Sequence, residues 1–155
     1  MRPSSIVAIM QQPEEIELPA RRFAGLTTRV EPNNPYVISA LWDRVRTDTT
    51  VPRITGCVNN GAMVAVYTEY ESDYTGAYTM LVGYEVTAEA EVPAGVRVIE
   101  VPPQKYAVIL AQGKQPQAVI EAWQWVWASS LDRVYTADFD EYLGQEDVRL
   151  HVAIR

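Results

Sequence analysis

With 155 residues, of which 48% are hydrophobic, and a net charge of -7, the sequence fits one acidic globular domain. An acidic surface repels phosphate backbones and no cluster of Lys or Arg offsets it, so we expect no direct binding of nucleic acid. The single cysteine, Cys57, and the single histidine, His151, leave little for a disulfide, a metal site or a Ser-His-Asp relay. No apolar run reaches the length of a membrane span or of a signal-peptide core, which predicts a cytoplasmic protein with no membrane contact. We also expect no cofactor and no metal.

The first half of the chain shows the order strand, helix, strand, strand. Residues 22–30 are rich in β-forming residues and partly alternate apolar with polar, which predicts a strand. Turn residues ending at Pro35 lead into residues 36–46, where apolar side chains recur at helical spacing on one face. Two further strands are expected at 63–70 and 78–86, because a polar turn that contains glycine separates them.

The second half follows the same order. After a connection marked by proline, strand segments are expected at 96–101 and 106–111. A second helix is expected at 117–131, with a stripe of apolar residues at helical spacing. Two strands at 134–142 and 148–154, joined by a turn that contains glycine, complete the chain.

The two halves share short matches in the same order, which indicates a duplicated unit. The matching pairs are Arg22-Phe23-Ala24 with Lys105-Tyr106-Ala107, Pro35 and Trp42 with Pro116 and Trp123, and Tyr67 to Tyr70 with Phe139 to Tyr142. Two pseudo-symmetric βαββ repeats, about 16–87 and 92–155, can pair their strands into one antiparallel sheet with both helices on one face. The predicted fold is therefore α+β, a single domain over 1–155 with a central ligand groove between the helices.

Several of these segments resemble the GyrI-like effector-binding domain, and within it the integron-associated effector-binding proteins that stand alone. The similar segments are 18–26 (LPARRFAGL), 92–95 (VPAG), 105–108 (KYAV), 122–123 (AW) and 138–142 (DFDEY). The resemblance extends over nearly the whole chain, and no residues are left over for the helix-turn-helix that many relatives carry. It implies two βαββ repeats and a cleft that takes hydrophobic cations between aromatic rings and a buried carboxylate.

The resemblance also implies which side chains face the cleft. Tyr78 resembles an aromatic position that faces the ligand, and Met80 shares its face by strand alternation. Ile38 and Ala118 fall where relatives face the cleft from the two helices. The other aromatic candidates, which also fit ordinary core packing, are Trp42, Trp123 and Trp125.

The acid of the cleft is the point where this sequence departs from its relatives. They carry Phe-Glu followed by Tyr two positions on, and here Asp140 stands in place of that Glu. The charge is kept on a shorter arm. Glu85, Glu121 and Glu146 are therefore alternative candidates for the acid of the cleft. The first two lie in mostly apolar stretches, where a carboxylate is costly to bury unless it has a partner or a function.

Three functions follow from the resemblance. The leading one is a stand-alone protein that binds lipophilic, cationic organic compounds, for drug sensing or sequestration, with a separately encoded regulator as a further partner. A second is hydrolysis of an activated small molecule, because GyrI-like hydrolases use a Glu with a nearby Tyr in this cleft, although Asp140 is one methylene shorter. A third is modulation of DNA gyrase by an acidic surface, which the scattered charges of this sequence disfavour.

Overall fold

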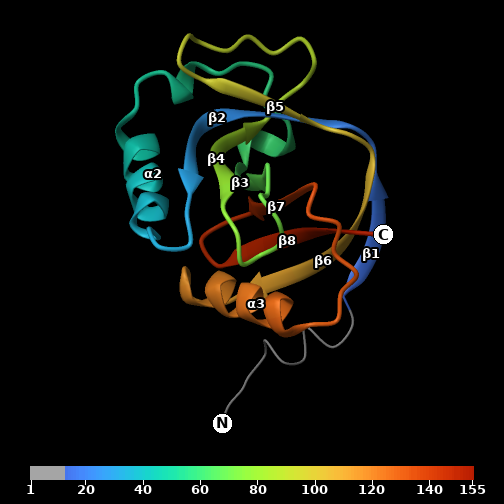
Figure 1. Ribbon diagram of the computed structural model, residues 1–155. Coiled ribbons are helices and arrows are strands. Elements are labelled where there is room, and N and C mark those ends of the chain that lie inside the picture. The colour runs from blue at the N-terminus through green and yellow to red at the C-terminus, as the bar shows by residue number, and fades with distance from the viewer. Residues whose placement is uncertain (1–12) are drawn as a thin grey trace.

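A computed structural model describes residues 13–155, and in it one eight-stranded antiparallel sheet carries two α-helices (Figure 1). The strands are β1 (Glu14–Leu18), β2 (Arg21–Val30), β3 (Met63–Thr68), β4 (Tyr78–Glu85), β5 (Arg97–Val101), β6 (Gln104–Gln112), β7 (Ala137–Tyr142) and β8 (Asp147–Ile154). The helices are α2 (Tyr36–Thr47) and α3 (Gln117–Ala128), and two short 3-10 turns are η1 (Val51–Arg53) and η2 (Asn59–Gly61). This is the α+β class that the sequence predicts.

The two helices begin alike, each directly after a proline. Pro35 precedes α2 and Pro116 precedes α3, as the repeat in the sequence predicts. The apolar stripe of α2 buries Leu41 and Val45 against the sheet. These two residues fix the face of α2 that packs on the sheet. Trp42 lies on the adjacent face of the helix and therefore points sideways, over the sheet, and not straight down onto it.

Helix α3 is shorter than the sequence predicts and ends at Ala128 instead of Leu131. The backbone N–H and the hydroxyl of Ser129 both donate to the carbonyl of Val126, which satisfies the last turn and stops the helix. The chain then runs irregularly to Ala137, with Tyr135 in the left-handed region at φ 58. This connection supplies side chains to the site described below.

The strand order is β1-β6-β8-β7-β3-β4-β2-β5, so β7 and β3 lie side by side at the centre of the sheet. Strands β2, β3 and β4 come from the first repeat, and β6, β7 and β8 from the second. The short strand at the start of each repeat pairs with the other repeat, because β1 pairs with β6 and β5 pairs with β2. Strand β1 is absent from the sequence-based expectations.

A pseudo-two-fold axis relates the halves and passes between β3 and β7. The rings of Trp42 and Tyr142 lie 5.3 Å apart at 72°, and those of Trp123 and Tyr67 also lie 5.3 Å apart at 72°. Tyr67 is therefore the counterpart of Tyr142. The third sequence match, which aligns Tyr67 with Phe139, is wrong, because Tyr67 lies on the helix-covered face and Phe139 on the opposite face.

The sheet is strongly curved, and a separate core fills its concave face. Phe23 on β2 and Phe139 on β7 are separated by three strand spacings, about 14 Å in a flat sheet, yet their ring centroids are 5.1 Å apart. Gly25 and Gly83 face each other on β2 and β4, where a Cβ on Gly83 would lie 2.0 Å from the carbonyl oxygen of Ala24.

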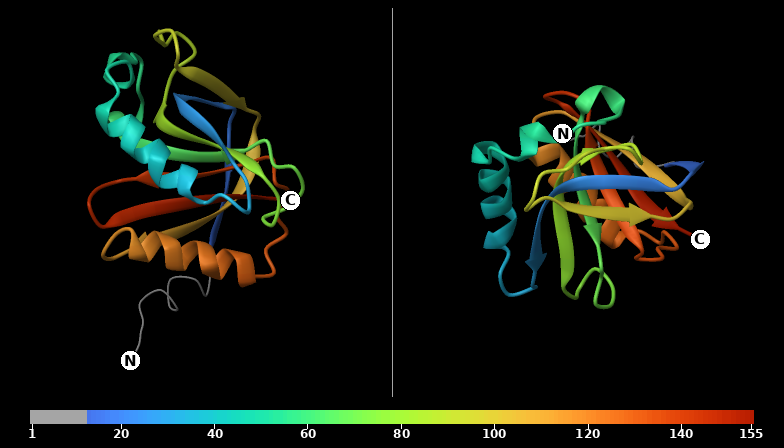
Figure 2. Two further views of the ribbon diagram at one scale, coloured as in Figure 1. Left: turned by 60° about the vertical axis from the view of Figure 1, so that its left-hand side comes forward. Right: turned by 90° about the horizontal axis from the view of Figure 1, so that it is seen from above.

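Both helices pack on the outer, convex face of this sheet (Figure 2). Because the sheet curves away between them, α2 and α3 diverge and leave room over the central strands. No helix within residues 13–155 is long and apolar enough to cross a lipid bilayer.

Candidate functional site

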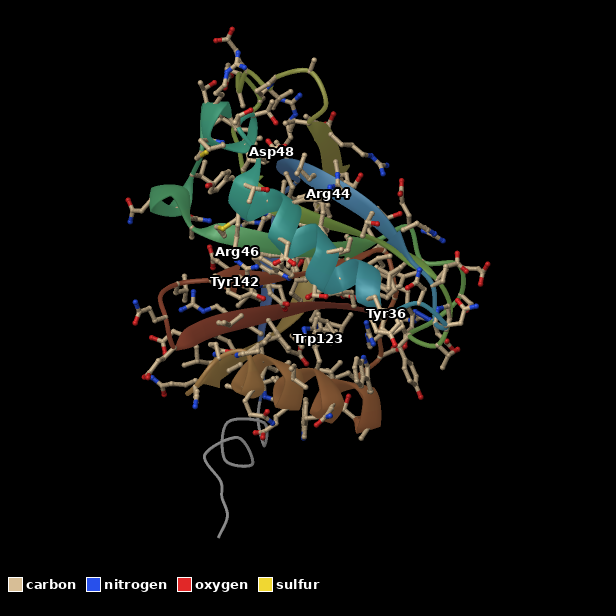
Figure 3. All side chains as sticks on the ribbon, turned by 90° about the vertical axis from the view of Figure 1, so that its left-hand side faces the viewer. Tyr36, Arg44, Arg46, Asp48, Trp123 and Tyr142 are labelled. Carbon is tan, nitrogen blue, oxygen red and sulfur yellow. The ribbon has the colours of Figure 1, made fainter. Side chains whose placement is uncertain are left out.

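A cavity of about 460 Å³ lies between α2 and α3, above the central strands β7, β3 and β4. Its walls are mostly aromatic and aliphatic side chains: Ile38, Ser39, Trp42, Tyr67, Tyr70, Tyr74, Tyr78, Met80, Pro116, Val119, Ile120, Trp123, Trp127, Arg133, Asp140 and Tyr142. In Figure 3, Trp123 and Tyr142 are seen between the two helices. A second hollow of about 510 Å³ lies beside β1 and β6, and no aromatic side chain of the described part of the chain lines it.

The aromatic side chains of the cavity contact one another in a continuous series. Tyr67 lies edge-on to Trp123, and its ring centroid is 5.9 Å from that of Tyr78. Tyr78 is in turn 5.9 Å from Tyr70. Because neighbouring rings hold each other in place, they present fixed π-faces and edges to the cavity.

The acid at the base of the cavity is Asp140, which is fully buried. The hydroxyl of Tyr67 donates to one carboxylate oxygen at 2.5 Å, and Nε1 of Trp123 donates to both oxygens at 3.0 and 3.2 Å. Burial raises the pKa of Asp140 to about 7, although these hydrogen bonds lower it. No arginine or lysine of residues 13–155 forms an ion pair with it.

A second buried acid, Asp138, is fully matched by donors. It accepts hydrogen bonds from the Tyr70 hydroxyl at 2.5 Å and from the Ala153 backbone N–H at 2.7 Å, and its ion pair with Arg133 measures 2.8 Å. Burial raises the pKa of Asp138, and the guanidinium of Arg133 opposes that rise. Arg133 also lies over the ring of Tyr135, at 4.3 Å from its centroid. Among residues 13–155, Asp138 behind the cavity therefore has a counter-charge and Asp140 in the cavity has none.

A comparison with protein families identifies the fold and its kind of site. The family model of Cass2, an integron-associated effector binding protein, matches residues 16–154. The chain belongs to this family. The resemblance found in the sequence is thereby confirmed, together with the predicted fold class.

Known relatives match this chain over most of its length. YobU of Bacillus subtilis (strain 168), whose name suggests a transcriptional regulator, is 30% identical over 132 residues, which cover 81% of this chain and 82% of YobU. The integron cassette protein VCH_CASS2 of Vibrio cholerae is 27% identical, with a TM-score of 0.76 over 94% of this chain and 97% of its own. SAV2435, solved with bound tetraphenylphosphonium, has the same fold, with a TM-score of 0.72 over 94% of each chain at 13% identity.

In this effector binding protein, six residues that the sequence predicts for the site are brought together around the cavity. They are Ile38, Trp42, Tyr78, Met80, Trp123 and Asp140. Among the four candidate acids, the structure thus places Asp140 in the cavity and the three alternative candidates elsewhere. That the six residues bind a ligand stays a prediction.

Four other predicted residues lie away from the cavity. Ala118 and Trp125 pack against the sheet beneath α3, because their places on the helix point toward β6 and β8. Glu121 accepts a hydrogen bond from Gln117 on the same helix at 2.7 Å. Glu146 is exposed in the turn before β8.

The remaining candidate, Glu85, lies on the opposite face of the sheet. In β4 its side chain shares the concave face with Leu81, whereas Met80 faces the helices. Glu85 is held there by an ion pair with Arg21 and by a hydrogen bond from Asn59 at 3.2 Å. Its place in an apolar strand is explained by these partners and not by a ligand.

Of the sixteen residues that line the cavity, sequence reasoning missed ten, among them Tyr67, Tyr70, Tyr142 and Arg133. Strand alternation could have found Tyr142, which lies two residues after Asp140 and therefore on the same face. Alternation along β3 could likewise have found Tyr67, which lies two residues after Ala65 and therefore on the same face of the sheet. Arg133 carried no such signal, because its position depends on where α3 ends and how the chain turns afterwards.

Proposed function

We propose that this effector-binding protein holds one lipophilic organic cation in the cavity between its helices, with Asp140 as the counter-charge. The observation that carries the proposal is a fully buried carboxylate that has no ion-pair partner among residues 13–155 and is surrounded by aromatic rings. That SAV2435, which has the same fold, was solved with tetraphenylphosphonium supports the choice of ligand class.

The physical reason lies in the cost of burying an unpaired charge. A carboxylate away from water loses its hydration, and the two donors at Asp140, Tyr67 and Trp123, replace it only in part. A cation that enters the cavity restores the balance of charge. Its apolar groups are covered by the aromatic walls, and ring faces attract a positive charge in a desolvated site.

A hydrolytic activity is the second candidate, and one observation favours it. Asp140 has a pKa of about 7 and accepts a hydrogen bond from Tyr67, which would suit a general base near neutral pH. Both of its oxygens, however, already accept bonds from protein donors. Recovery of a bound compound unchanged after long incubation would argue for binding alone, and steady product formation that stops in Asp140→Asn would argue for hydrolysis.

The binding proposal is tested by calorimetric titration with two ions of the same shape and opposite charge. Tetraphenylphosphonium is expected to bind as one ion per protein, and tetraphenylborate is expected not to bind, because its charge repels Asp140. Asp140→Asn should weaken the binding of tetraphenylphosphonium by about tenfold or more, as loss of a buried counter-charge predicts.

The control variant is Glu146→Gln, which removes one acid from an exposed turn outside the cavity. It changes the net charge of the protein as Asp140→Asn does, so it should leave the affinity for tetraphenylphosphonium nearly unchanged. Equal binding of the two ions, or equal binding of the cation by wild type and Asp140→Asn, would overturn the proposal.

A further inference from the structure

Of the described residues that line the cavity, two are charged, Asp140 and Arg133. A third charged group, Asp138, lies directly behind Arg133 and is paired with it. With both acids ionised, the three groups leave the cavity with one net negative charge. This count depends on Arg133, because without it neither of the two buried carboxylates would have a counter-charge among residues 13–155.

Arg133 is fixed in place by contacts on several sides. Its side chain is only 5% exposed, its guanidinium donates to Asp138 at 2.8 Å, and the ring of Tyr135 covers it. It also lies 5.7 Å from the ring of Trp123, the same ring whose Nε1 donates to Asp140. A ligand that contacts Trp123 beside Asp140 is therefore close to the guanidinium as well.

Asp138 cannot serve as a second counter-charge for a ligand. Its carboxylate is fully buried and already accepts bonds from Tyr70, Ala153 and Arg133. A second positive charge on a ligand would thus be repelled by the guanidinium of Arg133, in an interior where charges are poorly screened. One positive charge neutralises the cavity, whereas two would leave it positive.

We propose that Arg133, by cancelling Asp138, holds the cavity at one net negative charge and so selects organic ligands with a single positive charge over those with two. The inference rests on the proposed function, since it concerns the cation bound at Asp140. It goes further by naming the residue that sets the ligand charge.

A matched pair of ligands tests the selection. N-methyl-4-(4-methylphenyl)pyridinium and N,N′-dimethyl-4,4′-bipyridinium have the same two-ring skeleton with a methyl group at each end and differ by one positive charge. Calorimetric titration near pH 8, where Asp140 with its pKa of about 7 is ionised, should show the singly charged compound binding about tenfold or more tightly than the doubly charged one. Equal affinities would overturn the inference.

Two variants shift the charge count in opposite directions. Arg133→Met leaves two buried acids and should raise the affinity of the doubly charged compound relative to the other by about tenfold. Asp138→Asn leaves Arg133 uncancelled and should weaken the singly charged compound by about tenfold. An unchanged ratio in folded Arg133→Met, or an unchanged affinity in Asp138→Asn, would overturn the inference, and the second variant decides if the first does not fold.

The double variant Arg133→Met/Asp138→Asn removes both charges together and restores one net negative charge. It should prefer the singly charged compound as wild type does, and loss of that preference would mean that Arg133 acts by shape and not by charge, against the inference. The proposed function is judged separately. If tetraphenylphosphonium binds through Asp140 but both pyridinium compounds bind with equal affinity, the proposed cation site is supported and the proposed charge selection is overturned.

Discussion

Asp140 has two donors for its carboxylate, Tyr67 and Trp123, and no ion-pair partner among residues 13–155. The donors explain how the charged form is tolerated at all in a fully buried position. Burial nevertheless dominates, and it raises the pKa of this group from 3.8 to about 7. At neutral pH the acid is therefore close to its titration midpoint, so both the stability of the protein and its attraction for cations should depend on pH.

The sign of the stability effect follows from which state holds the proton. Between about pH 4 and pH 7 the folded protein keeps a proton on Asp140 that the unfolded chain releases, so the free energy of unfolding falls as the pH rises through this range. Asp140→Asn removes the titration. Relative to this variant, wild type should lose about 2 kcal/mol of stability between about pH 5 and pH 8, as measured by urea unfolding. A constant difference between the two proteins would contradict the raised pKa.

Cation binding should show the opposite trend with pH. The ionised carboxylate attracts a cation and the neutral acid does not, so affinity for tetraphenylphosphonium should rise as the pH passes about 7 and then level off. Asp138 should contribute little to this change, because its charge is already matched by Arg133.

At the scale of helices and strands, the elements with a clear hydrophobic period are those that the sequence predicts well. The periodic stripe of α2 gives its start at Tyr36 and its end within one residue. The errors occur where a local hydrogen bond ends an element before its hydrophobic pattern does, as at Ser129, which ends α3 early. Strand β1 was missed because it is a five-residue edge strand with three glutamates, and edge strands often carry such charges.

The same division applies to the site. Side chains that follow from strand or helix periods, such as Met80 and Trp123, could be placed from the sequence, and Glu85 was misplaced because an acid in an apolar strand does not reveal its partner. Arg133 could not be placed, since an irregular connection between α3 and β7 carries it into the cavity.

The close approach of β2 and β4 at Gly25 and Gly83 leads to a prediction about the sheet. A Cβ on Gly83 would lie 2.0 Å from the carbonyl oxygen of Ala24, so the strands would have to separate where the sheet bends. Gly83→Ala should lower the free energy of unfolding by about 2 kcal/mol or more in urea denaturation. Gly144→Ala, in an open turn with nothing within 4 Å, is the control and should have little effect. Equal stability of the two variants would count against the bend.

At the scale of the whole molecule, the pseudo-two-fold axis makes Trp42 and Trp123 counterparts. They differ in one hydrogen bond. Each ring packs edge-on against a tyrosine of the other repeat, but the indole N–H of Trp123 alone donates to Asp140. The architecture is thus nearly symmetric, whereas the polar contacts of the cavity are not.

This difference can be measured with matched substitutions. Trp42→Phe and Trp123→Phe both keep an aromatic ring, but Trp123→Phe removes a hydrogen bond that lowers the pKa of Asp140. The pH midpoint for binding tetraphenylphosphonium should therefore rise by about one unit in Trp123→Phe, and should stay unchanged in Trp42→Phe. Similar midpoints in both variants would show that the indole N–H has no influence on the acid.

The register of the central strands has a consequence for the origin of this cavity. Ala65 on β3 pairs directly with Asp140 on β7, and because Tyr67 is the counterpart of Tyr142, these two residues are counterparts as well. A homodimer of identical half-chains would place either two carboxylates or none at this spot. Two copies within one chain can differ at this position, so that one carries a methyl group and the other carries the acid.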